Sequence, residues 1–271
     1  MSQLLTIAER LKAVTNIQKI AHAMQLISMS NLSRINAQKK AFTLYINELE
    51  KLSEQVGFTS KIILPEKKAR TLYVIIGSQK GFCGNFNGIL FQYLKLTQDI
   101  SKISACIPIG PYAYNLCNQH HIPIQSAKIN YSLANLAQKT NLIFEEIQKA
   151  HKNFDSLMII SNLNISIFTQ KPQSTIISLA HTSPANSNPE LPFIIEQPFE
   201  EIFAYINNIT IKTKIFQLLL ESLRAENSAR ALTMDSSTRN AKKLLAEMKL
   251  MYNKLRQAKV TKELIELSSS L

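Results

Sequence analysis

All 6 glycines and all 9 prolines of the chain lie between Gly57 and Pro198. Because both residues interrupt helices, the segments on either side can form helices far longer than average. Apolar residues follow three- and four-residue steps in both segments, at Leu4, Ile7, Leu11, Val14, Ile17, Ala21, Met24 and Ile27, and at Leu244, Met248, Met251, Leu255 and Ala258. Helices of such length need a partner for their apolar stripe, so we expect a long antiparallel coiled coil between the chain's ends. The poor helix formers Asn207 to Thr210 predict a break in the second helix.

The middle segment alternates between patterns typical of strands and of helices. Apolar runs predict strands at residues 72–76, 105–109, 157–160 and 175–179, with helices at 87–96, 112–119 and 134–152. This order predicts a Rossmann-like α/β domain with a mostly parallel sheet. A proline-rich loop then leads back to the last helix. The overall fold class is therefore α+β or α/β. We expect three parts: an N-terminal coiled-coil helix (1–58), the α/β domain (59–198) and a C-terminal coiled-coil helix (199–271).

Composition narrows the class of protein. Among the 271 residues, 45% are hydrophobic and 18% charged, which is typical of a folded chain. No stretch has the roughly 18 unbroken apolar residues of a transmembrane helix, and the N-terminus lacks a signal-peptide layout. Cys83, Cys106 and Cys117 have neither CxxC spacing nor a matching histidine pair, which favours reduced thiols in a cytoplasm over disulfides or zinc.

One turn invites comparison with a phosphate-binding loop. Residues 77–85 read GSQKGFCGN after a predicted strand, yet this spacing matches neither GxGxxG nor GxxxxGK[ST]. A turn in which the backbone approaches another segment closely is the better interpretation. Cys83 lies near Lys80 but has no evident histidine partner, so it is interpreted as a packed side chain. The histidines and carboxylates form no ligand or acid/base pattern, and we expect no catalysis, metal or cofactor.

Charge gathers near the C-terminus of a chain whose net charge is +12. Residues 239–262 contain one acidic residue, Glu247, and eight basic ones: Arg239, Lys242, Lys243, Lys249, Lys254, Arg256, Lys259 and Lys262. Such a stripe is usually a solvated face, but its self-repulsion favours an acidic partner. Nucleic acid and an acidic protein surface both remain open, although only Tyr252 supplies an interleaved aromatic ring.

Several segments together resemble one known family. The similar segments are 16–20 with 23–24 (NIQKI, AM), 32–34 (LSR), 81–87 (GFCGNFN), 221–230 (ESLRAENSAR), 233–241 (TMDSSTRNA) and 252–264 (YNKLRQAKVTKEL). They are similar to the segments that mark the gamma subunits of F-type ATP synthases, in the same order. Gln79 and Lys80, His22 and Asn227 depart from that pattern, as do Asn207 and Asn208, where the family often has proline.

This resemblance implies a non-catalytic central rotor shaft that couples ion-driven rotation of the membrane c-ring to conformational cycling of the catalytic alpha and beta subunits. It also implies an epsilon-subunit partner and a peripheral place on the cytoplasmic side of the bacterial inner membrane. The residues implied to contact the alpha/beta ring are Lys19, Met24, Arg239, Arg256, Gln257, Thr261 and Glu263. Those implied on the side of the c-ring and epsilon are Lys80, Gly81, Cys83 and Gly84.

Two other functions compete with this expectation. A basic coiled-coil protein binding nucleic acid would show an affinity that falls steeply with salt. A nucleotide-dependent α/β enzyme using the turn at Gly81 would bind nucleotide saturably.

Overall fold

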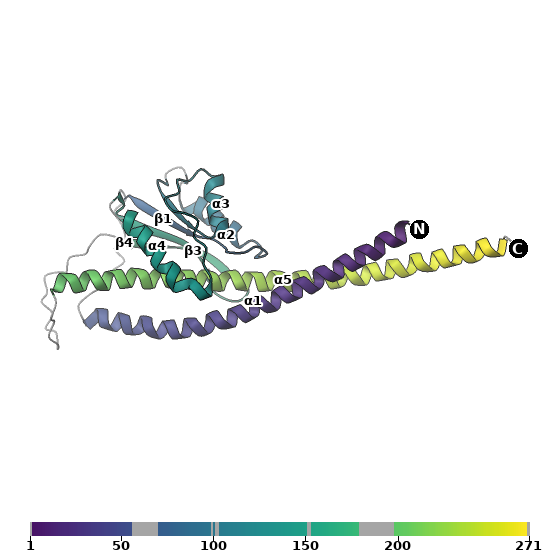
Figure 1. The fold of residues 1–271 in the computed structure, drawn as a ribbon, viewed down its shortest axis with the longest axis horizontal. Coiled ribbons are helices and arrows are strands. Elements are labelled where there is room, and N and C mark those ends of the chain that lie inside the picture. The colour runs from purple at the N-terminus through teal and green to yellow at the C-terminus, as the bar shows by residue number, and fades with distance from the viewer. Residues whose placement is uncertain are drawn as a thin grey trace. The chain divides into compact units, whose positions relative to one another are not determined.

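The computed structural model describes residues 2–55, 70–98, 100, 103–150, 153–178 and 198–269 of the chain. Its elements, in order, are α1 (Ser2–Gln55), β1 (Thr71–Ile76), α2 (Phe86–Thr97), β2 (Cys106–Ile109), α3 (Pro111–Gln119), η2 (Leu133–Asn135), α4 (Leu136–Ala150), β3 (Ser156–Asn164), β4 (Gln170–Ser178) and α5 (Phe199–Ser269), as Figure 1 shows. The long terminal helices and the alternation between them are as predicted. Lys152, Leu179, the boundary at 58/59 and the prolines at 184, 189 and 192 lie outside the described residues.

The chain divides into two compact units, and both long helices contribute to each. Residues 1–30 and 230–271 form the coiled unit, and residues 31–229 form the sheet unit. The three-part division expected from the sequence stays a prediction.

The sheet unit holds four strands in the order β2-β1-β3-β4. β1 pairs in parallel with β2, where Tyr73 faces Cys106, and with β3, where Thr71 faces Ser156. β3 and β4 are antiparallel neighbours. The sheet is therefore mostly parallel, as predicted, with one antiparallel edge strand.

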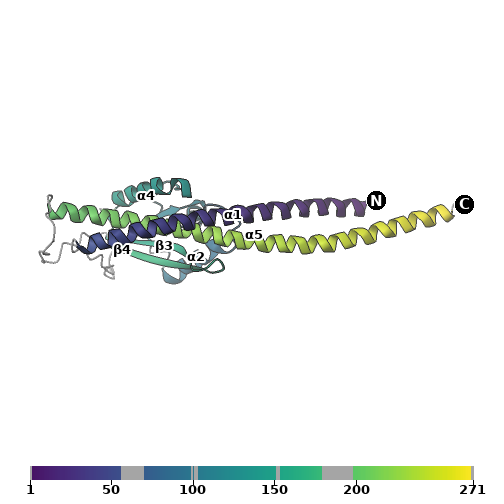
Figure 2. The ribbon, with the colours of Figure 1, turned by 90° about the horizontal axis from the view of Figure 1, so that it is seen from below.

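Alternate side chains of β1 enter two separate apolar cores. Val74 and Ile76 point into one of these cores. Helix α4, Ile35 of α1 and Leu219 of α5 complete it. Ile75 points into the opposite core, which α2 and α3 cover. Figure 2 shows α4 and α2 on opposite sides of the strands. Both faces of the sheet are thus buried, which explains the continuous apolar runs of β1 and β3.

Within the sheet unit, α1 and α5 run antiparallel. Lys39 Nζ lies 2.5 Å from Glu221 Oε1, and the Phe42 and Phe216 rings are 4.5 Å apart between centroids. The predicted break in the second helix is wrong, because α5 continues through Asn207 to Thr210. Buried Ile206 and Ile211 flank these residues, and Thr210 Oγ1 donates to the Ile206 carbonyl at 2.8 Å. Packing here outweighs weak helix propensity.

The coiled unit pairs the first part of α1 with the last part of α5. The N and C labels of Figure 1 lie at the same end of this unit, and Gln25 Nε2 donates to Asp235 Oδ1 at 3.0 Å. Side chains that are buried or half-buried define its seam: Leu4, Ile7, Leu11, Val14, Gln18, Ala21, Gln25 and Ser28 on α1, and Ala231, Met234, Thr238, Ala241, Leu245, Met248, Tyr252 and Leu255 on α5. Alternating steps of three and four give the 3.5-residue repeat of a coiled coil.

This seam corrects the register expected from the sequence. Ile17 and Ile27 are 58% and 60% exposed, and Leu244 and Met251 are 45% and 56% exposed, although all four were expected in the stripe. Gln18, Ser28, Leu245 and Tyr252 take the inner positions instead. Seven residues of the expected stripe do lie in the seam: Leu4, Ile7, Leu11, Val14, Ala21, Met248 and Leu255. Apolar spacing alone therefore finds much of the seam and fails where polar residues such as Gln18 and Ser28 fill it.

Candidate functional site: the glycine turn and the exposed faces of the long helices

The turn between β1 and α2 is anchored at both of its ends. Gly77 N donates to the Ile109 carbonyl at 2.9 Å. Ser78 N donates a hydrogen bond to Asn87 Oδ1 at 3.1 Å, and Asn87 Nδ2 donates one to Ser78 Oγ at 2.8 Å. A Cβ added to Gly77 would lie 2.8 Å from the Ala113 backbone nitrogen, so a side chain there would displace α3. This close approach is the role that the sequence predicted for the turn.

The turn is also bonded to α5 through a buried carboxylate. Glu226 Oε2 accepts from Gln79 N at 2.8 Å, and Glu226 Oε1 accepts from Lys80 N at 3.1 Å. Glu226 is 2% exposed. Sequence reasoning missed this residue, which lies within the segment 221–230 that carries the resemblance. The sequence signal that could have found it is a glutamate with small residues on either side in a helix, Ala225 and Ala229 among them.

Held in this way, the turn presents an aromatic side chain to solvent. Phe82 is 68% exposed and has a φ of 60°, a left-handed conformation that side chains seldom adopt. Lys80 and Gly84 are exposed and Gly81 is half-buried. Cys83 instead points inward, where it packs with Phe86, Ala225 and Ala229. Of the four turn residues in the expected site, Cys83 therefore offers a partner its backbone rather than its thiol.

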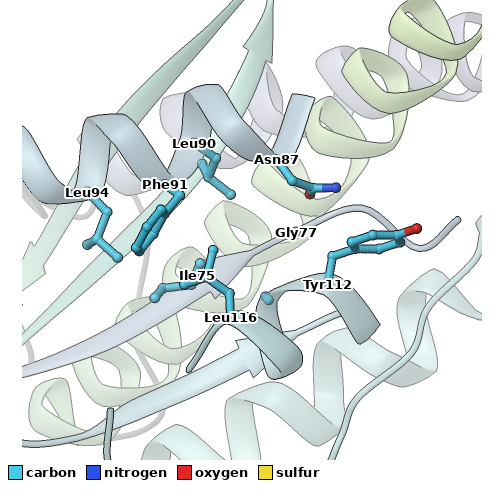
Figure 3. Close-up of a pocket in the computed structure, with 9 residues that line it drawn as sticks. Ile75, Gly77, Asn87, Leu90, Phe91, Leu94, Tyr112 and Leu116 are labelled. Carbon is cyan, nitrogen blue, oxygen red and sulfur yellow. The ribbon is translucent and has the colours of Figure 1, made fainter. Parts of the chain in front are cut away.

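A small apolar pocket lies beside the turn (Figure 3). It is lined by Ile75, Gly77, Asn87, Leu90, Phe91, Leu94, Tyr112, Ala113 and Leu116, and its cavity volume is about 10 Å³. That volume holds about one water, whereas pockets for drug-sized ligands span roughly 300–1,000 Å³. The pocket is therefore too small for a nucleotide. Across the described parts of the chain, no cluster of histidine, cysteine and acidic side chains is suited to a metal ion.

The remaining expected contact residues lie on the surface of the coiled unit. Lys19 is exposed and Met24 half-buried on α1. On α5, Arg239 pairs with Asp235 at 2.9 Å, and its side chain is 65% exposed. Each of these side chains except that of Met24 is thus open to a partner.

Four further residues of that set gather near the end of α5. Arg256, Gln257, Thr261 and Glu263 are all exposed. Thr261 Oγ1 donates to the Gln257 carbonyl at 2.9 Å, and Glu263 lies 3.5 Å from Lys259 Nζ. Every described side chain from residue 256 to 269 is exposed, including Val260, Leu264, Ile265 and Leu267, which are apolar.

Comparison with known proteins identifies the family. A family model described as ATP synthase matches residues 3–271. The ATP synthase gamma chain of Pelagibacter ubique is 30% identical over 291 residues, which cover 99% of this chain and 98% of that protein. The chain belongs to the ATP synthase gamma-chain family.

Solved structures support the fold of this chain. The rotor of the Euglena gracilis mitochondrial ATP synthase matches with a TM-score of 0.73 and 14% identity, covering 96% of this chain and 99% of that one. A chain of the OSCP/F1/c-ring assembly from the same organism matches with a TM-score of 0.74 and 15% identity, covering 99% and 93%. The family makes the chain a component of an ATP synthase and gives no support to nucleic-acid binding. Among the described helices, none combines the length and apolarity needed to cross a bilayer.

Proposed function

We propose that the chain is the central rotor shaft of an F-type ATP synthase and has no catalytic site of its own. It couples ion-driven rotation of the membrane c-ring to conformational cycling of the alpha/beta ring, where ATP is made or hydrolysed. The observation that carries this proposal is the end of α5, which stays exposed from residue 256 to 269 yet holds four large apolar residues. An exposed apolar surface of this kind is suited to burial inside a ring of partner subunits.

Rotation acts through differential contact. A shaft that contacted all catalytic subunits equally would shift no equilibrium among them, so its faces have to differ. This end of α5 also carries two exposed ion pairs, Lys259 with Glu263 at 3.5 Å and Lys262 with Glu266 at 3.7 Å. We assign Arg256, Gln257, Thr261 and Glu263, with Lys19, Met24 and Arg239, to contact with the alpha/beta ring.

A pair of double variants tests this assignment. Arg256→Ala with Gln257→Ala should lower ATP synthesis and ATP-driven ion pumping by the assembled enzyme, since Arg256 can bond a carboxylate in a bidentate manner. Lys262→Ala with Glu266→Ala is the matched control, because it removes two exposed polar side chains from the same end of α5 that are outside the assigned set. Both should leave helicity unchanged, as exposed substitutions usually do. Equal coupled activity in the two variants and the wild type contradicts the assignment.

The exposed turn is the second contact that we propose. Lys80, Gly81, Cys83 and Gly84 are assigned to the side of the c-ring and epsilon subunit, with Phe82 as the protruding group. A photo-crosslinker placed at Phe82 in the assembled enzyme should label epsilon or the c-ring. Labelling of alpha or beta instead would move this turn to the catalytic ring, while leaving the shaft proposal in place.

Location follows from the partners. We propose a peripheral membrane protein on the cytoplasmic side of a bacterial inner membrane, held by the c-ring. It should fractionate with membranes, leave them with the alpha and beta subunits on washing at low ionic strength, and co-purify with both in fixed stoichiometry. An isolated chain that binds RNA with a steep salt dependence, without recovery of alpha and beta, would favour the nucleic-acid alternative.

A further inference from the structure

The hydrogen bonds between Glu226 and the turn have the arrangement that backbone amides adopt around a bound anion. Two carboxylate oxygens accept from two successive backbone N–H groups, those of Gln79 and Lys80, at 2.8 and 3.1 Å. Successive amides that point the same way form a concave, positively polarised nest of the kind that binds phosphate and other oxyanions. Hydrogen bonds from such donors to an ionised group are stronger than neutral ones.

The turn also lies where ligands bind in related sheet topologies. It follows the carboxyl end of β1, and the order β2-β1-β3-β4 places β2 and β3 on opposite sides of β1. Ligands of open α/β sheets bind outside the carboxyl ends of strands at such a switch point. In this chain a residue of α5 occupies that position.

The surroundings of the carboxylate are buried and rich in hydrogen-bond donors. Three buried polar side chains gather here, because Tyr131 interacts with both Gln79 and Ser222 and all three are shielded from solvent. Burial first, and then the nearby negative charge of Glu226, raises the pKa of Tyr131. The carboxylate thus resides among polar groups that water or a small oxyanion would also satisfy.

We propose that the Gln79–Lys80 turn is an anion-binding nest whose ligand in the native chain is the Glu226 side chain. This internal ligand does two things. It excludes phosphate groups from the switch point, and it fixes the turn to α5 so that Phe82 is held in its left-handed conformation. Removal of the carboxylate leaves a site for a small oxyanion such as formate, acetate or inorganic phosphate.

Hydrogen exchange with chemical rescue tests the nest in the full chain. In Glu226→Ala, the amides of Gln79 and Lys80 should exchange at least about tenfold faster than in the wild type, because two charge-assisted bonds are lost. Added sodium formate should restore protection in this variant and leave the wild type unchanged. Inorganic phosphate should bind the variant, with its signal saturating in the millimolar range, and should not bind the wild type.

Glu221→Ala is the matched control. Glu221 is also a buried glutamate of α5, but it pairs with Lys39 and Arg224. Its loss should leave the exchange of Gln79 and Lys80 insensitive to formate. Glu226→Gln keeps the volume and one acceptor, so one of the two amides should lose protection and formate should have no effect.

Three results would overturn the proposal. One is a folded Glu226→Ala chain that formate does not rescue, and another is equal rescue of Glu221→Ala. The third applies if Glu226→Ala fails to fold: full protection of the Gln79 and Lys80 amides in Glu226→Gln would then overturn the proposal. These readouts use the chain alone, so they are independent of the rotor function.

Discussion

The sheet unit and the coiled unit bury their side chains in different ways. The sheet unit has two apolar cores and binds its buried polar groups across elements, as Asn162 Nδ2 does to the Phe86 carbonyl at 3.0 Å. The described part of the coiled unit packs a narrow seam that mixes apolar residues with small and polar ones. It exposes large apolar residues on both helices: Leu5, Ile17, Ile20, Leu26, Ile27, Met29, Leu244, Leu250, Met251, Val260, Leu264, Ile265 and Leu267. Large apolar side chains that stay exposed in their own chain are available to a partner. The sheet unit also exposes large apolar residues, Leu96 and Phe168 among them, so the two units differ chiefly in what they bury: two apolar cores in one and a narrow seam in the other.

A matched pair of isoleucine truncations should give the largest difference between the units. Ile143 of α4 is 0% exposed, whereas Ile20 of α1 is 60% exposed. Ile143→Ala should lower the free energy of unfolding by about 2–5 kcal/mol, since it removes buried methyl groups and leaves a cavity. Ile20→Ala should change it by no more than about 0.5 kcal/mol, because the lost atoms are solvated and alanine favours helix. Urea unfolding followed by far-ultraviolet circular dichroism measures both, and similar losses would remove the distinction between the units.

Ion pairs should follow the same contrast with a smaller effect. The Glu221 side chain is 8% exposed and contacts both Lys39 and Arg224, whose side chain is 19% exposed. Glu221→Ala leaves Arg224 largely buried without this carboxylate and should cost about 2–4 kcal/mol. Asp235→Ala removes a more exposed pair with Arg239 in the coiled unit together with the hydrogen bond from Gln25 Nε2, and should cost less, about 1–2 kcal/mol.

Salt separates the two cases further. Raising NaCl to about 1 M screens exposed charges within a few ångströms, so the cost of Asp235→Ala should shrink while that of Glu221→Ala persists. Unfolding curves at low and high salt provide the check. A strongly salt-sensitive cost at Glu221 would mean that this pair is solvated in solution.

Much of the architecture could be predicted because it depends on local pattern. The confinement of glycine and proline predicted both long helices, and the apolar run at residues 72–76 predicted a strand buried on both faces. The seam could not be predicted in the same way. Spacing alone favoured Ile17 and Ile27 over Gln18 and Ser28, since it assumes that apolar residues face the helix partner. A chain that exposes apolar residues to other subunits violates this assumption.

The candidate site shows the same limit. The turn at Gly77 to Asn85 could be located from its glycines, and its close backbone approach was expected. The bond from Glu226 to Gln79 and Lys80 joins residues about 150 positions apart, and no local pattern predicts such a pair. The expected contact residues at the end of α5 came from the family resemblance. Their exposure is compatible with that role, which stays a prediction.

A pair of serine substitutions tests the seam of the coiled unit directly. Ser28 is 1% exposed, and its Oγ donates to the Met24 carbonyl at 2.8 Å, whereas Ser30 is exposed on the same helix. Ser28→Leu inserts a large side chain between closely packed helices and should cost about 1–3 kcal/mol. Ser30→Leu makes the same chemical change in solvent and should be nearly neutral. Amide exchange along residues 2–30 should accelerate only in Ser28→Leu, and acceleration in both variants would place the seam elsewhere.

The smallest effect should come from a buried phenol and depend on pH. Burial, followed by the charge of Glu226, raises the pKa of Tyr131 in the folded chain above its ordinary value. A group whose folded pKa is raised contributes stability that is complete below the unfolded pKa and is lost as pH rises toward the folded value. Because the unfolded pKa is about 10, the wild type should lose stability relative to Tyr131→Phe only above about pH 9.5. Near pH 7 the phenol is neutral in both the folded and the unfolded chain, so the Tm difference between the two should not vary with pH there. Tyr252→Phe, at a half-buried position in the seam of the coiled unit, makes the same chemical change outside the sheet unit. Differential scanning fluorimetry between pH 7 and 11 measures all three chains. Parallel Tm curves for Tyr131→Phe and the wild type would show that the phenol is reached by water, and that the sheet unit is more open at this point than its packing indicates.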